Sequence, residues 1–172
     1  MRESILTLLF LSLFFACKTE SQSLQKKEYP RIIGDISKDS LLDNPNFKVC
    51  DSLERGAQYY HKKKSFAYTG EKAAVLEVFA NEFKPLGEED QNGWIRIRFM
   101  VNCEGQTGRF RMIESNFDYE EFQFDKIITD QLMSITKSLD GWEILSHQNT
   151  GYDYYQYLIF KIEDGQLTEI LP

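Results

Sequence analysis

A run of alternating residues from Gly93 to Glu114 constrains the fold of this chain more than any other stretch. It reads GWIRIRFMVNCEGQTGRFRMIE, with an apolar side chain at every second position of its first half. A period of two residues is that of a β-strand with one face in a core, because successive side chains point to opposite faces. Residues 104–108 include two glycines, which favour a tight reversal before the alternation resumes. The run therefore predicts a β-hairpin.

The first strand of this hairpin has one apolar face and one mixed face. The apolar face carries Ile95, Ile97, Phe99, Val101 and Cys103, and the mixed face carries Trp94, Arg96, Arg98, Met100 and Asn102. A helix packed on the apolar face would bury Phe99, so we expect Phe99→Ala to cost roughly 3–5 kcal/mol of stability. Arg98 falls on the other face, and we expect Arg98→Ala to cost under about 1 kcal/mol.

Hydrophobic periodicity predicts three further elements around the hairpin, and the Asp164-Gly165 pair, a two-residue hairpin signal, indicates a fourth. They are helices at residues 70–84 and 120–139, a strand at 152–162 and a short final strand at 166–171. Thr69 is placed to cap the first helix, and Gly141 is placed to take the left-handed conformation after the second. The apolar stripe of the first helix consists of Val75, Leu76, Phe79 and Phe83. We therefore expect an α+β fold, with an antiparallel sheet of three or four strands and two helices.

The N-terminal residues 1–16 have the pattern of an export signal. Their apolar run at residues 5–16 has the length of a signal-peptide core and is too short to span a bilayer. The stretch LFFAC that ends at Cys17 resembles the lipobox of bacterial lipoproteins, with Phe14 where leucine is usual. The resemblance implies a lipid on Cys17 and an outer-membrane lipoprotein that faces the periplasm. Ordinary secretion and a retained anchor are the alternatives.

The mature chain then divides by composition into three parts. Residues 17–28 are polar and predict a flexible tether. Residues 29–69 show no sustained apolar period, so we expect an irregular segment that wraps the domain. The domain itself is expected at residues 70–172. The chain is acidic, with a net charge of -7 and no basic block longer than residues 62–64, which argues against nucleic acid as a partner.

Residues with catalytic or metal-binding chemistry are sparse. The two histidines, His61 and His147, fall in a lysine-rich loop and a polar turn, and neither belongs to a hydrolase motif. The cysteines lack the spacing of a metal site, so we predict no enzyme activity, no metal and no cofactor. Cys50 and Cys103 can form a disulfide in an oxidising envelope, whereas Cys103 can equally be a small core residue.

The order of elements and several motifs together resemble a known family. A helix that opens with GEK precedes GWIRIRFMVNCEGQTGRFRM, and a long helix, a Gly141-Trp142 pair, an NTG turn and YQYLIFKI follow. This arrangement is similar to the C-terminal domain of TonB-type energy transducers, and the similarity covers residues 70–162. The family's founders also have an inner-membrane helix and a proline-rich spacer, whereas this chain has four prolines in total.

The resemblance implies a binding function without energy transduction. In the family, a short peptide of the partner pairs with an edge of the sheet. We therefore expect a non-enzymatic envelope lipoprotein that binds an envelope or outer-membrane protein by strand addition. The alternative is a small envelope hydrolase or a carbohydrate-binding accessory protein, which would use the tyrosines at positions 152, 154, 155 and 157.

Lipidation can be tested at Cys17. We expect Cys17→Ser to leave an unprocessed precursor that no longer incorporates radiolabelled palmitate, because the thiol is the acceptor in lipoprotein maturation. Metabolic labelling followed by electrophoresis measures both effects. Processing of the variant to mature size would contradict the assignment.

Overall fold

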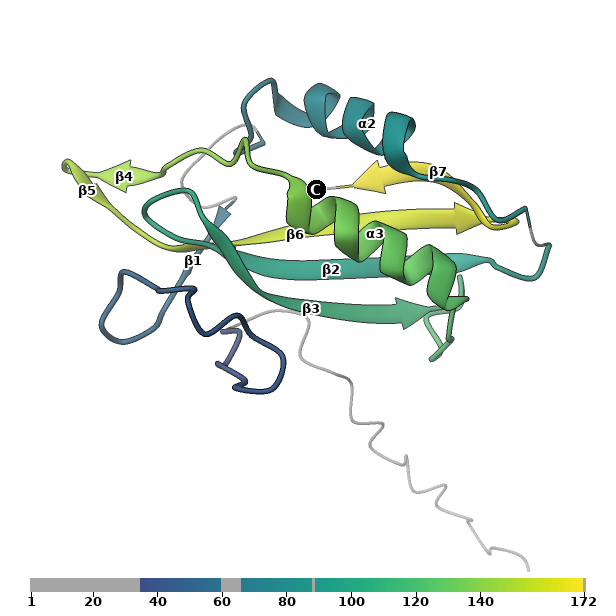
Figure 1. Cartoon of the computed structure of the whole chain (residues 1–172), viewed down its shortest axis with the longest axis horizontal. Helices are drawn as coiled ribbons and strands as arrows, with labels where there is room; N and C mark the ends of the chain where they lie inside the picture. Colours follow the sequence, from purple (N-terminus) through teal and green to yellow (C-terminus); the bar gives the residue numbers. More distant parts are fainter. Residues whose placement is uncertain (1–34, 60–65, 88, 172) are drawn as a thin grey trace, which may run out of the picture. The chain divides into compact units, whose positions relative to one another are not determined.

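The computed structural model describes residues 35–59, 66–87 and 89–171, which form a mixed β-sheet with two helices (Figure 1). The hairpin expected from the alternating run is present as β2 (Gly93–Val101) and β3 (Thr107–Ser115), which pair antiparallel. The α+β prediction is confirmed. In the described residues the sheet has five strands, in the order β1-β6-β2-β3 with β7 also paired to β6, so it is larger than expected.

The additional strand comes from a segment expected to be irregular. Strand β1 (Ala57–Gln58) pairs parallel with the start of β6 (Tyr154–Glu163), and β7 (Gln166–Leu171) pairs antiparallel with the end of β6. Asp164 and Gly165 connect β6 to β7 with φ angles of 49° and 71°, the left-handed pair that a two-residue hairpin turn uses. A small separate hairpin is formed by β4 (Ser146–His147) and β5 (Thr150–Gly151).

One face of the sheet carries the main core. Helices α2 (Glu71–Glu82) and α3 (Lys126–Ser138) both contribute to the cluster that covers this face, which we call the helix face. Phe99 lies at its centre and is fully buried, with ring centroids 5.0 Å from those of both Phe110 and Trp142. Neither helix, nor any other in the described part of the chain, is long and apolar enough to cross a membrane.

Helix α3 begins six residues later than expected, at Lys126 rather than at Glu120. Asp125 caps it, because its side chain accepts a hydrogen bond from the backbone N–H of Ile127 at 2.6 Å. Glu121 instead forms a bridge with Ser115 at the end of β3. The apolar periodicity of residues 120–139 places Ile127 on the core side of this helix, but Ile127 is 55% exposed, whereas Ile128, Leu132 and Ile135 are buried.

The capping predictions for both helices are wrong. Gly70 rather than Thr69 is the N-cap of α2, with φ of 81° and no side-chain hydrogen bond. Gly141 does not take a positive φ; a Cβ at this position would lie 2.7 Å from the ring of Tyr68, so the glycine permits close packing. Leu76 of the predicted stripe is 39% exposed, whereas Val75, Phe79 and Phe83 are buried.

The opposite face of the sheet is also covered over part of its area. Ile36, from the segment before β1, forms a second core with Met100 and Tyr155, and Phe47 and Val49 pack against it. Arg98 lies on this face but is only 5% exposed, with its guanidinium 5.2 Å from the centre of the Tyr157 ring. The alternation therefore places Arg98 on the expected face, and the side chain is buried there because residues 35–59 cover this end of β2.

The register suggests a matched stability test on the two central strands. Phe99→Ala removes a fully buried ring, and we expect a loss of roughly 3–5 kcal/mol in the free energy of unfolding. Ile159→Ala changes a half-buried residue on the other face, and we expect a loss of about 1–2 kcal/mol. Urea denaturation of both variants measures the difference in the free energy of unfolding. Equal losses would show that the two side chains are not on the differently buried faces to which the register assigns them.

Candidate functional site

Strand β3 forms one edge of the sheet. It pairs with β2 along one side, and on its other side the described residues provide one bridge, between Ser115 and Glu121 at its end. An edge strand presents backbone N–H and C=O groups that can pair with another chain. One carbonyl, that of Phe110, already accepts a hydrogen bond from the guanidinium of Arg111 at 2.8 Å. The edge is therefore a candidate site for an added strand.

A β-bulge gives this edge its local shape. Arg98 pairs with Arg111 and Met100 pairs with Gly108, so two residues of β3 face one residue of β2. Arg109 lies in the bulge with φ of 55°, which is unusual for a residue with a side chain. The bulge lets Arg109 point to the face opposite the helices, and its side chain is buried there against residues 35–59. The next residue, Phe110, points to the helix face and stacks on Phe99.

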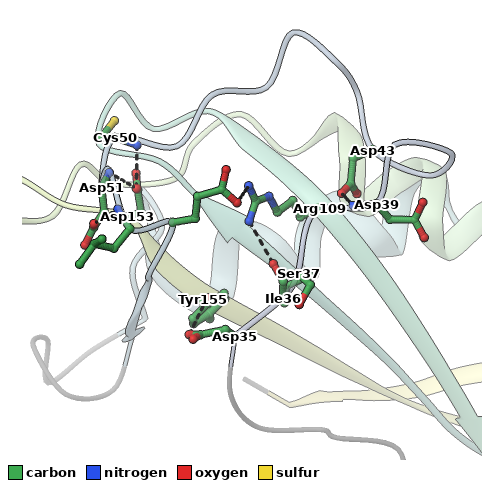
Figure 2. A network of polar contacts seen from close by, with 12 residues as sticks. Asp35, Ile36, Ser37, Asp39, Asp43, Cys50, Asp51, Arg109, Asp153 and Tyr155 are labelled. Carbon is green, nitrogen blue, oxygen red and sulfur yellow. Dashed lines mark hydrogen bonds and ion pairs between the residues drawn. The ribbon is translucent and has the colours of Figure 1, made fainter.

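A groove of about 750 Å³ runs beside β3. Residues 107–112 of β3 line it together with Met133 and Lys137 of α3. On the far side it is bounded by Leu42, Asp43 and Asn44. We call residues 35–59 the N-terminal wall, because this segment supplies that boundary. The position of the wall depends on three sets of polar contacts, two of which Figure 2 shows.

The first set joins Asp43 to Arg111. The carboxylate accepts from the guanidinium at 2.6 and 3.0 Å, and the same guanidinium donates to the carbonyl of Ser37 at 2.9 Å. The hydrogen bond to Arg111 holds the pKa of Asp43 below its ordinary value and raises the pKa of Arg111. A lowered carboxyl pKa means that the pair stabilises the fold above the ordinary Asp pKa and that this contribution is lost as the pH falls.

The second set is centred on Arg109, whose side chain is 5% exposed. Its guanidinium donates to the carbonyl of Ile36 at 3.1 Å and to the carboxylate of Glu54 at 2.8 Å (Figure 2). These bonds tie two separate points of the N-terminal wall to the bulge of β3. Glu54 is half exposed, so its side of the ion pair remains in contact with solvent.

The third set is centred on Asp153, which is 1% exposed and immediately precedes β6. One carboxylate oxygen accepts from the backbone N–H groups of Cys50 and Asp51 at 2.7 and 2.9 Å (Figure 2). The other accepts from the N–H of Cys103 at 3.1 Å. Cys50 and Cys103 are joined as a disulfide, so one buried carboxylate holds the backbone on both sides of the bond.

This cluster is built as a clamp. The sulfur atoms and a carboxylate oxygen of Cys50, Cys103 and Asp153 lie within 4.8 Å of one another, a spacing that could suit a metal ion. Sulfurs joined as a disulfide are not the thiolates that bind metal, and both oxygens of Asp153 are already hydrogen-bonded. Sequence reasoning raised the disulfide but missed Asp153, which is a single acid between two tyrosines with no motif around it.

The other sequence-predicted residues do not join this site. Cys17 and His61 lie outside the described residues, and His147 lies exposed in β4. Tyr154 and Tyr155 are fully buried, so these two are not a sugar-binding surface. Burial raises the pKa of Tyr154, whose hydroxyl donates to the carbonyl of Glu143 at 2.9 Å. Burial also raises the pKa of Tyr155 to about 12, and its hydroxyl donates to Asp35 at 2.9 Å.

The clamp can be tested by substitution at Asp153. Asp153→Ala leaves three backbone donors without their acceptor, and we expect a loss of roughly 3 kcal/mol in the free energy of unfolding. Asp153→Asn keeps one oxygen acceptor and should lose less. Loss of the disulfide by double substitution of Cys50 and Cys103 to serine should cost on the order of 4 kcal/mol, since it closes a long loop. Urea denaturation measures each, and an Asp153→Ala variant as stable as the parent would contradict the clamp.

Comparison with known proteins does not place the chain in a family. No protein-family model matches it, and no curated protein or solved structure matches it either. The resemblance to TonB C-terminal domains therefore stays a prediction from the sequence motifs alone.

Proposed function

We propose that this chain is a non-enzymatic lipoprotein of the bacterial cell envelope whose domain binds a partner protein by strand addition to β3. The observation that carries the proposal is the exposed edge of β3 beside a groove of about 750 Å³. The resemblance to TonB C-terminal domains supports it, because that family uses a sheet edge for its partner. The lipobox-like stretch ending at Cys17 supports attachment to the outer membrane, on its periplasmic side.

The groove would read the side chains of the added strand at alternate positions. Residues of that strand that point to the helix face would meet Phe110, Met112 and Met133, which are apolar and partly exposed. Lys137 of α3 lies on the same side of the groove, with its ammonium 5.5 Å from the centre of the Phe110 ring. We therefore expect the partner segment to be extended, with apolar residues on its groove-facing side.

Site-specific photo-crosslinking in native envelopes tests the location of the edge. A photoreactive amino acid at Met112 should crosslink to a partner, because this side chain lines the groove. The same amino acid at Thr168, an exposed position on the opposite edge strand β7, is the matched control and should not give that product. Equal crosslinking from both positions would contradict a β3-specific site.

The partner peptide identified in this way tests the mode of binding. Strand addition depends on main-chain hydrogen bonds, so methylation of the peptide nitrogens that face β3 should weaken binding about tenfold or more. Methylation of the alternate nitrogens, which face away, should have little effect. Isothermal titration calorimetry measures both, and equal affinities for the two methylated peptides would exclude strand addition.

A further inference from the structure

Part of the sheet face opposite the helices is left open by the N-terminal wall. Trp94 and Arg96 of β2 point to this face, together with their cross-strand neighbours Ile113 of β3 and Lys161 of β6. Phe117 and Tyr119, from the loop after β3, extend over it and are 37% and 67% exposed. We call these six residues the Arg96 platform. It is separate from the groove, which runs along the edge of β3 between α3 and the N-terminal wall and is lined by none of these six residues.

Arg96 is held in place by neutral groups. Its guanidinium donates to the hydroxyl oxygen of Ser115 at 2.9 Å and lies 5.5 Å from the centre of the Tyr119 ring. Among the described residues, no carboxylate forms an ion pair with it. A guanidinium has five N–H donors arranged as a fork that fits a carboxylate. Arg96 is half-buried, and this desolvation lowers its pKa from the ordinary value. Keeping the guanidinium charged at this position therefore costs desolvation free energy.

Three other cations around the sheet have acidic partners. Arg109 pairs with Glu54, Arg111 pairs with Asp43, and Lys161 pairs with Glu163 at 2.8 Å. A chain with a net charge of -7 has carboxylates in excess, so a half-buried arginine that pairs with none of those in the described region is unusual. The position therefore favours an anionic group supplied from outside the domain.

Aromatic rings frame this cation. Trp94 and Phe117 meet edge to face, with centroids 5.7 Å apart, and Lys161 lies 5.6 Å from the centre of the Phe117 ring. Partly exposed Trp, Tyr and Arg side chains that are fixed by their neighbours are the composition of energetic centres in protein interfaces. The contacts that Trp94 and Arg96 already make limit the conformational entropy that their side chains lose on binding.

We propose that the Arg96 platform binds an acidic segment of a partner protein. The guanidinium receives an Asp or Glu carboxylate through paired N–H···O bonds, and an apolar side chain next to that acid packs on Trp94 and Phe117. An anionic membrane surface fits less well, because the chain is acidic overall and Glu163 and Glu169 border the platform on β6 and β7. A single carboxylate can reach Arg96 without approaching these two acids, whereas an anionic membrane surface would come close to both.

A peptide titration of the full chain, followed by NMR, tests the proposal. The probe is the capped peptide Gly-Phe-Glu-Phe-Gly, and its counterpart Gly-Phe-Gln-Phe-Gly lacks the charge. We expect the acidic probe to shift the side-chain N–H resonances of Arg96 and Trp94. The neutral probe should bind with an affinity at least about tenfold lower. Equal binding of both probes would overturn the proposal.

Variants separate the platform from general charge effects. Arg96→Gln should weaken the acidic probe about tenfold, and Arg96→Lys should recover only part of the affinity, because lysine lacks the fork. Lys126→Gln removes a cation that is 86% exposed on α3 and should change nothing. Tyr119→Ala, at an exposed position, provides a second variant if Arg96→Gln unfolds, and it should also weaken the probe.

Two further outcomes would overturn the assignment. Unchanged affinity in Arg96→Gln and Tyr119→Ala would show that the probe binds elsewhere. Arg96-dependent binding to phosphatidylglycerol vesicles without binding of the acidic peptide would identify the face as a membrane contact instead. The variant Phe110→Ala, in the groove on the helix side, should leave the acidic probe unaffected, so a failure of the platform and a failure of the β3 edge are distinguishable.

Discussion

The pairing of β2 with β6 is the constraint on which the rest of the structure depends. These strands run antiparallel from the Gly93–Ile162 pair to the Val101–Tyr154 pair, and they form the centre of the sheet. Where Phe99 and Met100 pair with β6, both faces of the sheet must be covered, because Phe99 is fully buried on one face and Met100 on the other. Two helices cover the first face, and the N-terminal wall covers the second. The segment before β1 is therefore part of the fold.

The cover on the second face has few apolar residues and depends on polar contacts at defined points. Ile36 is the one buried apolar residue of the N-terminal wall, with Phe47 and Val49 partly buried beside it. The disulfide, the carboxylate of Asp153 and the guanidinium of Arg109 supply the remaining attachment. A bulge with Arg109 at φ of 55° costs of order 1–3 kcal/mol in backbone strain, which its hydrogen bonds to the wall, a buried one to Ile36 and a partly exposed one to Glu54, help to offset.

Strong local patterns were predictable from the sequence, and long-range contacts were not. Alternation located β2, the Asp-Gly turn located the β6–β7 hairpin, and apolar stripes located both helices approximately. The start of α3 was missed because Glu121 forms a bridge with Ser115 at the end of β3, and the helix begins only after Asp125. Burial of Arg98 and the role of Asp153 depend on a segment that is distant in the sequence and has no apolar period, so no local pattern indicated them.

The N-terminal wall has a consequence for where a partner can bind. By covering only one end of the second face, it leaves Trp94 and Arg96 open at the other end while it borders the groove beside β3 at Leu42. An added strand on β3 would lie next to Ile113, which pairs with Arg96 across the hairpin. Side chains on the far side of that strand would then point toward the Arg96 platform. A partner segment with apolar residues toward the groove and an acid on the alternate side would therefore engage both surfaces at once.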